Sequence, residues 1–206
     1  MKVLLLNGSP RKDGNTALAL GEMARVFEAE GVETELIQAG QLDVRGCVAC
    51  RACVQTGKCA FDDIVNELAP KLEAADGLVL GTPVYYASVN GTLSALLDRL
   101  FYSTRFDKTM KVGASVAVAR RAGTTCACDE LNRYFSISGM PVASSVYWDG
   151  VFGGTPKENA SQDAEGMQVM RTLARNMTFL MKSIALGKER YGLPEKESRT
   201  LTNFIR

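Results

Sequence analysis

The sequence predicts an α/β fold, a five-stranded parallel sheet in the strand order 2-1-3-4-5 between two layers of helices. Short apolar runs alternate with segments of helical periodicity, a pattern that implies a parallel sheet covered on both faces. The 206 residues, 46% of them hydrophobic, suit one domain with its own core. In such a three-layer sandwich, ligands bind at the carboxyl ends of the strands, near the switch between strands one and three.

Each expected strand is a short apolar run that is followed by a turn. The five runs lie at residues 3–6, 32–37, 77–81, 112–119 and 141–146. In the second run, apolar residues alternate with Glu33 and Glu35, as in a half-polar strand at the edge of a sheet.

The expected helices lie between these strands. They cover residues 16–30, 62–75, 93–101, 126–138 and 170–184, and Pro70 predicts a kink or a new start in the second. We expect a single domain over residues 1–186, with a cysteine-rich loop at 46–60 and a mixed-charge C-terminal tail at 187–206.

The composition excludes several kinds of chemistry and partner. The chain has no histidine, which rules out Ser-His-Asp and Cys-His catalysis and His-ligated catalytic zinc. The net charge of +1 gives no positive field for nucleic acid. No apolar stretch is long enough to span a membrane, and the first apolar run ends too soon for a signal peptide. We therefore expect a cytoplasmic protein, in which cysteines are metal ligands, redox groups or buried thiols.

The loop after the first strand, residues 7–16, has more donors than a turn needs. Ser9, Asn15 and Thr16 offer side-chain donors, Arg11 adds charge, and a helix N-terminus follows. This combination predicts a cradle for a phosphate monoester. The alternative is an ordinary capped turn with Asn15 as the cap. No Walker motif or Gly-x-Gly-x-x-Gly is present.

Two further loops open at the same edge of the expected sheet. The loop after strand three contains Pro83, Val84, Tyr85, Tyr86 and Ser88, and its adjacent tyrosines could stack on a flat aromatic ligand. Alternatively, they are surface residues of a turn. A phosphate at one end and a ring at the other describe FMN. The loop after strand four carries Arg120 and Gly123; Arg120 and its neighbour Arg121 could meet the flavin or a NADPH phosphate, or could face solvent.

Four of the six cysteines lie within thirteen residues. They form Cys-x2-Cys-x2-Cys-x5-Cys, whose first three cysteines have the spacing of those in [4Fe–4S] ferredoxins. The predicted ligands are Cys47, Cys50, Cys53 and Cys59. Bound zinc and unligated thiols are the alternatives. The remaining two cysteines, Cys126 and Cys128, begin an expected helix, and buried packing is favoured over a lowered thiol pKa.

The motifs together resemble a known family. Gly-Ser-Pro-Arg-Lys-x-Gly-Asn-Thr, Thr-Pro-Val-Tyr-Tyr-Ala-Ser and Leu-Asp-Arg are similar to the NADPH-dependent FMN reductases, and the cysteine loop to the iron-sulfur flavoproteins among them. The resemblance implies a flavodoxin-like fold and FMN bound through the first two loops. It also implies a [4Fe–4S] cluster and a homodimer or homotetramer. The loop at residues 119–125 departs from the family pattern, which is glycine-rich there.

Three functions follow from these features. The first is a redox flavoprotein, in which the cluster relays electrons between FMN and a ferredoxin-like external carrier. The second is a cluster-free reductase of FMN or quinones with NAD(P)H as co-substrate. The third is a flavodoxin-type electron carrier, which the near-neutral charge disfavours.

Overall fold

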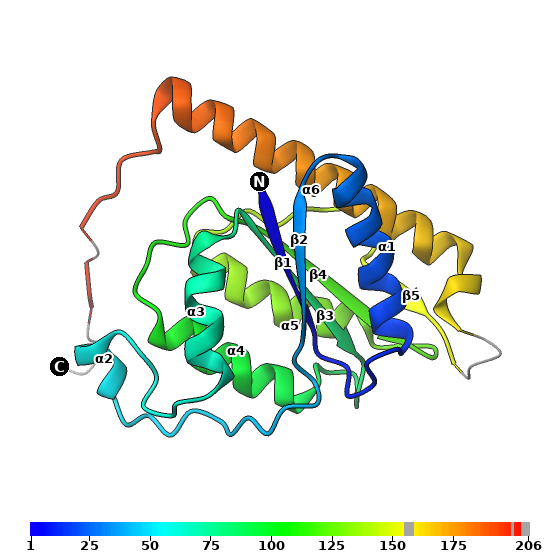
Figure 1. The fold of residues 1–206 in the computed structure, drawn as a ribbon, viewed down its shortest axis with the longest axis horizontal. Helices are drawn as coiled ribbons and strands as arrows, with labels where there is room; N and C mark the ends of the chain where they lie inside the picture. The colour runs from blue at the N-terminus through cyan, green and yellow to red at the C-terminus, as the bar shows by residue number, and fades with distance from the viewer. Residues whose placement is uncertain (155–158, 199, 203–206) are drawn as a thin grey trace.

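A computed structural model describes residues 1–154, 159–198 and 200–202 of the chain. Five parallel strands form one sheet in the order β2-β1-β3-β4-β5, so the predicted order is confirmed (Figure 1). The strands are β1 (Lys2–Asn7), β2 (Glu33–Gln38), β3 (Gly77–Pro83), β4 (Val112–Ala119) and β5 (Gly150–Phe152). The helices are α1 (Asn15–Ala29), α2 (Ala52–Thr56), α3 (Ile64–Ala74), α4 (Gly91–Ser103), α5 (Thr124–Ile137) and α6 (Ala164–Tyr191), with a short 3-10 turn at Ala160–Gln162.

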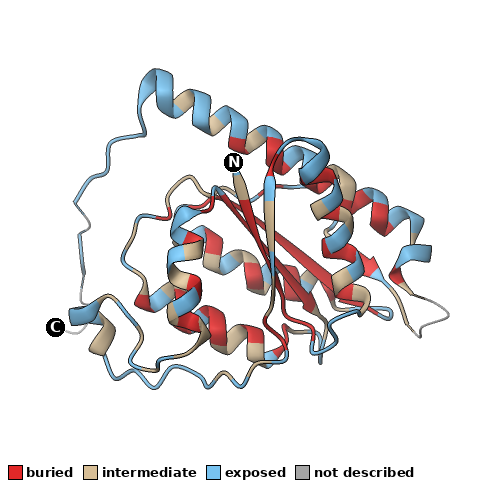
Figure 2. Ribbon diagram, in the orientation of Figure 1, coloured by how far each residue is buried: buried red, intermediate tan, exposed pale blue. Residues whose placement is uncertain are grey.

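Helices cover both faces of the sheet, as the alternating pattern predicts. Alternate residues of β1 point to opposite faces: Val3 and Leu5 pack with α1 and α6, whereas Leu4 and Leu6 pack with α3, α4 and α5. Figure 2 shows the buried residues concentrated in the sheet and on the inner faces of these helices. Residues 41–60, which include the cysteine loop and α2, are all exposed or half-buried. The cysteine loop therefore lies outside the main core.

The fifth strand is not where the sequence predicts it. The segment at residues 141–146 touches β4 only at one bridge, between Val142 and Gly113, and β5 forms later, where Gly150 pairs with Ala117. Between these two pairs the chain advances eight residues while β4 advances four. The four extra residues form an excursion in which Trp148 is 66% exposed, whereas in a continuous strand it would pair with β4.

Two helices also differ from the expectation. Helix α3 contains Pro70 without a break, although proline removes one intrahelical hydrogen bond. Helix α6 continues to Tyr191, so the first five residues of the expected tail are helical. Tail residues 199 and 203–206 lie outside the described residues. Within the described part of the chain, no helix combines the length and the apolar character that crossing a membrane requires.

Candidate functional site

The expected phosphate loop leaves the carboxyl end of β1 and is organised by its own hydrogen bonds. The amide of Gly8 donates to the carbonyl of Gly81 at 2.7 Å, which joins the ends of β1 and β3. The Asn7 side chain accepts from the amide of Ser9 at 3.0 Å, and Ser9 Oγ accepts from the amide of Arg11 at 3.1 Å. These bonds turn the chain tightly into α1. The Arg11 side chain is exposed and makes no hydrogen bond or ion pair to another described residue.

Helix α1 begins without a side-chain cap. Its N-cap is Gly14, so Asn15 is the first helical residue and not the cap that the alternative interpretation requires. Asn15 instead accepts a hydrogen bond from the amide of Ala160 at 3.0 Å and approaches the carbonyl of Gly154 at 3.5 Å. This contact ties the segment that follows β5 to the phosphate loop. The uncapped amides of the first turn remain available to an anion.

The tyrosine loop after β3 makes a strained turn. Tyr85 and Ser88 exchange two backbone hydrogen bonds of 3.0 Å, and the residues between them, Tyr86 and Ala87, have φ values of 52° and 59°. Positive φ at both central positions is typical of a type I′ turn, which glycine and asparagine usually occupy. Each non-glycine residue there costs roughly 1–2 kcal/mol, and such strain concentrates at functional sites. The turn presents the fully exposed ring of Tyr86 to solvent.

Glu130 on α5, a residue that motif reasoning missed, holds this turn in place. Its carboxylate accepts from the Ser88 hydroxyl at 2.5 Å and from the amide of Val89 at 3.2 Å. On the other side, Thr82 Oγ1 accepts from the amide of Asn90, whose side chain caps α4. The partners Ser88 and Glu130 are 42 residues apart, so no local pattern could have found the contact.

The third loop packs against the tyrosine turn at Gly123. This residue has a φ of 91°, and a Cβ there would lie 2.9 Å from Ala87 Cα, so no larger residue fits. Arg120 and Arg121 line an open groove of about 500 Å³ together with Gly153 and Gly154. Since Asn15 contacts Gly154, the groove lies beside the phosphate loop. The structure therefore brings the three predicted loops to one edge of the sheet.

All four cysteines of the predicted metal motif line one pocket. It is narrow, with a cavity volume of about 20 Å³, and is lined almost entirely by apolar surface, with Phe61, Arg99 and Tyr102 among its other residues. Left-handed backbone at Ala49 and Arg51, one between each pair of the first three cysteines, curves the loop around it. No three potential ligands among the described residues are close enough together to form a finished metal centre. The loop thus gathers the thiols around one cavity but does not close them into a coordination shell.

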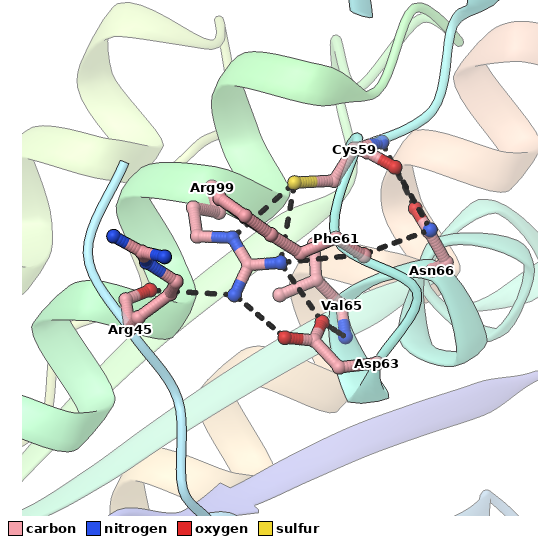
Figure 3. Close-up of polar contacts among 7 residues, drawn as sticks. All are labelled: Arg45, Cys59, Phe61, Asp63, Val65, Asn66 and Arg99. Carbon is pink, nitrogen blue, oxygen red and sulfur yellow. Dashed lines mark hydrogen bonds and ion pairs between the residues drawn. The ribbon is translucent and has the colours of Figure 1, made fainter. Parts of the chain in front are cut away.

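One of these cysteines, Cys59, is held firmly. Its sulfur accepts hydrogen bonds from Arg99 Nε at 3.3 Å and Nη2 at 3.2 Å (Figure 3). Its amide donates to the side chain of Asn66 at 2.9 Å, and the Asn66 amide group donates back to the Cys59 carbonyl at 3.0 Å. Arg99 is 1% exposed and also pairs with Asp63 at 2.7 Å. Burial alone would lower the pKa of Arg99, but its bonds to Asp63 and Cys59 raise it overall.

Comparisons with known proteins agree with this arrangement. Residues 1–152 match the family described as NADPH-dependent FMN reductase. An iron-sulfur flavoprotein of Methanocaldococcus jannaschii is 34% identical over 191 residues, which cover 89% of this chain and 99% of the relative. The chain belongs to this reductase family, among its iron-sulfur flavoproteins. A second such protein, from Methanosarcina thermophila, is 30% identical over 194 residues, covering 92% of this chain and all of the relative.

The fold of the chain is flavodoxin-like. A solved flavodoxin from the domain Archaea superposes with a TM-score of 0.60 at 15% identity, covering 88% of this chain and 99% of the other. Family and fold together make the chain a flavin-dependent oxidoreductase that uses FMN. The chain's own geometry fits that cofactor. Helix amides without a side-chain cap lie at one end of the site, beside Arg11, which has no partner among the described residues, and an exposed tyrosine turn lies at the other.

The two remaining cysteines, both on α5, differ in their exposure to solvent. Cys128 is buried as expected, and its thiol donates to the carbonyl of Asp149 at 3.5 Å; burial raises its pKa to about 12, so it is not a reactive thiolate. Cys126 is exposed, contrary to the expectation of packing. Burial also raises the pKa of Asp149 to about 7, and its Oδ1 has no hydrogen-bond partner among the described residues. The sequence carries no local signal for this carboxyl.

Proposed function

We propose that the protein passes electrons between FMN and an external carrier through a [4Fe–4S] cluster held by Cys47, Cys50, Cys53 and Cys59. The observation that carries this proposal is the placement of all four cysteines around one pocket. The apolar lining, the curved loop and the arginine directed at one sulfur suit a body bound by thiolates. The names of the two relatives indicate an iron-sulfur cluster, and the spacing of the first three cysteines favours the [4Fe–4S] type.

The flavin is proposed to lie along the carboxyl edge of β1, β3 and β4. Ser9, Arg11, Asn15 and Thr16 would hold its phosphate, since Ser9 and the α1 amides face the tight loop. The ring would lie against the strained turn, with Arg120 and Gly123 on its other side; the turn residues are Pro83, Val84, Tyr85, Tyr86 and Ser88. FMN supplies the chemistry of exchanging both electron pairs and single electrons, while these residues bind and orient it.

The chain has no histidine to move protons, so water is the proposed proton source at the flavin. We also propose a homodimer or homotetramer and a ferredoxin-like carrier as the partner. The exposed aromatic excursion at Tyr147 and Trp148, which are 60% and 66% exposed, is a surface that a second copy could cover.

The proposal is tested by the cofactor content of protein purified without oxygen. We expect iron and acid-labile sulfide in equal amounts, four of each per FMN, and no zinc. The variant Cys50→Ser should lose the iron and keep the FMN, and Cys126→Ser is the matched control with both retained. Iron-free protein after anaerobic reconstitution would contradict the cluster. Unchanged FMN reduction by a one-electron donor in Cys50→Ser would contradict the relay.

A second candidate is a cluster-free NAD(P)H-dependent reductase of FMN or quinones. The groove that Arg120 and Arg121 line beside the phosphate loop favours it, because paired arginines suit a dinucleotide phosphate. Rapid oxidation of NADPH or NADH with a quinone acceptor, undiminished in Cys50→Ser, would support this candidate over the relay.

A further inference from the structure

We propose that Arg99 is a positioning residue for the cluster: its guanidinium fixes the sulfur of Cys59 and makes reduction of the bound cluster easier. The inference rests on the proposed function, since it takes the four cysteines as ligands. It concerns a residue on α4, 40 positions away from Cys59 in the sequence.

The guanidinium uses two different edges for two different partners. The Nη1/Nη2 edge forms a forked pair with Asp63, with distances of 2.7 and 2.9 Å to its two oxygens. The Nε/Nη2 edge faces Cys59 Sγ at 3.3 and 3.2 Å (Figure 3). Backbone carbonyls of Arg45 and Phe61 accept the remaining bonds at 3.3 and 3.4 Å. Sulfur is therefore the acceptor for one whole edge of a buried cation.

This arrangement suits a metal-bound sulfur as the acceptor. A thiol is a weak acceptor, and a buried Arg99 whose Nε had only a thiol as partner would be poorly satisfied. A metal-bound thiolate accepts charge-assisted bonds well. A purely structural ion pair would need only Asp63, which also caps α3 by accepting from the amide of Val65. The Nε/Nη2 edge, which contacts Cys59, therefore distinguishes a role in positioning the cysteine from a purely structural ion pair.

The anchoring of the four cysteines is unequal. Cys59 is held through its sulfur by Arg99 and through its backbone by Asn66. For the thiols of Cys47, Cys50 and Cys53, the described part of the chain shows no comparable side-chain bond, and Cys47 and Cys50 are exposed. Cys59 is thus the preset ligand, toward which the other three can close. Arg99 is what presets its sulfur.

The same bonds should tune the cluster. Hydrogen bonds to ligand sulfurs and nearby positive charge stabilise the reduced form, which carries one more electron, and so raise the reduction potential. Arg45 is a useful contrast, because it too lies over the ring of Phe61, with its guanidinium carbon 4.7 Å from the ring centre against 5.0 Å for Arg99. It brings the same charge to the neighbourhood with no side-chain bond to the cysteine among the contacts of the described chain.

The test uses the double variant Arg99→Gln/Asp63→Asn, which removes the cation without leaving the carboxylate unpaired; asparagine still caps α3. Arg45→Gln is the matched control for charge alone. The readouts are iron and sulfide per FMN in anaerobically purified protein, and the midpoint potential of the cluster by spectroscopic redox titration. Retained FMN in each variant reports the folded flavin site.

In the double variant we expect loss of most of the iron. Where the cluster persists, the equilibrium constant for its one-electron reduction should fall at least tenfold, which corresponds to a midpoint lowered by 59 mV. Arg45→Gln should keep the iron, and its equilibrium constant for cluster reduction should stay within threefold of the wild-type value. The inference would be overturned if the double variant kept wild-type iron and an equilibrium constant for reduction within threefold of wild type. It would also be overturned if Arg45→Gln shifted that constant as much as the double variant does.

Two further results separate the possible failures. If the wild-type protein itself holds no iron, the proposed function is contradicted. Wild-type iron and potential in the double variant contradict only the role of Arg99. If the double variant does not fold, Arg99→Lys replaces it, since lysine keeps the charge but cannot present the forked edge. We then expect partial loss of iron on gel filtration under conditions where wild type retains it; wild-type retention and potential would overturn the inference.

Discussion

The flavin side of the molecule and its cysteine side are organised in different ways. On the flavin side, the three loops at residues 8–16, 82–88 and 120–124 are held in place by backbone bonds, a half-buried carboxylate contact and close glycine packing. On the cysteine side, the loop at 46–60 is tied to the fold chiefly at Cys59, through Arg99 and Asn66. The chain therefore shapes the proposed flavin site by its own bonds, whereas in the cysteine loop only Cys59 is anchored by side-chain bonds among the described residues.

This difference predicts that damage on one side spares the other. The largest effect we expect is from Arg11→Gln on the flavin side. Charge-assisted bonds to a phosphate contribute about 1.5–3 kcal/mol, so the Kd for FMN should rise by roughly 10- to 100-fold. Riboflavin, which lacks the phosphate, is the matched control and should bind equally well to both proteins. Titration by flavin fluorescence measures both Kd values. An equal loss of affinity for riboflavin would show that Arg11 does not bind the phosphate.

The reciprocal change on the cysteine side is Asn66→Ala. It removes two bonds to the backbone of Cys59 and one of 3.2 Å to the carbonyl of Phe61. We expect the free energy of unfolding in urea to fall by about 2 kcal/mol, with FMN affinity unchanged. Glu67→Ala, an exposed neighbour on α3, should cost only a few tenths of a kcal/mol. A loss of FMN affinity in Asn66→Ala would show that the two sides are coupled.

A smaller effect is expected from Glu130→Ala, which frees the tyrosine turn. Loss of its bonds to Ser88 and Val89 should weaken FMN binding by about 3- to 10-fold, on the order of 1 kcal/mol. Iron content should not change. The exposed neighbour Asp129 supplies the control, because Asp129→Ala should leave both quantities as they are. FMN affinity equal to wild type in Glu130→Ala would mean that the turn holds its shape without α5.

The smallest effect should follow from Ala87→Gly. Glycine relieves the left-handed strain at a φ of 59°, worth about 1–2 kcal/mol, but makes the unfolded chain more flexible. The net gain in the free energy of unfolding should be about 0.5–1 kcal/mol. The same substitution at the exposed helical position Ala185 should instead lose about 0.5–1 kcal/mol. A loss at both positions would show that the turn at Ala87 is not strained.

Local patterns predicted most of the fold and the sets of residues in each loop. Apolar runs and helical periodicity identified four strands and the five main helices, because these features depend on neighbours in sequence. The predicted position of strand five was wrong. The run at 141–146 is as apolar as a strand, but the excursion before Gly150 depends on pairing with β4, which a local pattern does not show. The FMN residues and the metal ligands remain predictions that the structure places together.

The supporting residues were beyond the reach of the motifs. Arg99 belongs to a Leu-Asp-Arg motif that carried the family resemblance, but its partners Cys59 and Asp63 lie 40 and 36 residues away. Glu130 meets Ser88 only when α5 packs beside β4. Asn15 was assigned to a phosphate or a cap, and a bond to Ala160, 145 residues away, was not foreseeable. Only tertiary contact makes these pairs.

Helix α4 begins at the tyrosine loop, with its cap Asn90 bound to Thr82, and carries Arg99 nine residues later. At 1.5 Å of rise per residue, these two points are about 14 Å apart along the helix axis. The helix is thus a rigid spacer between the places where the ring and the cluster are proposed to bind in one chain. Insertions in either loop would change what is bound at an end of this spacer, while the distance between its ends would stay the same.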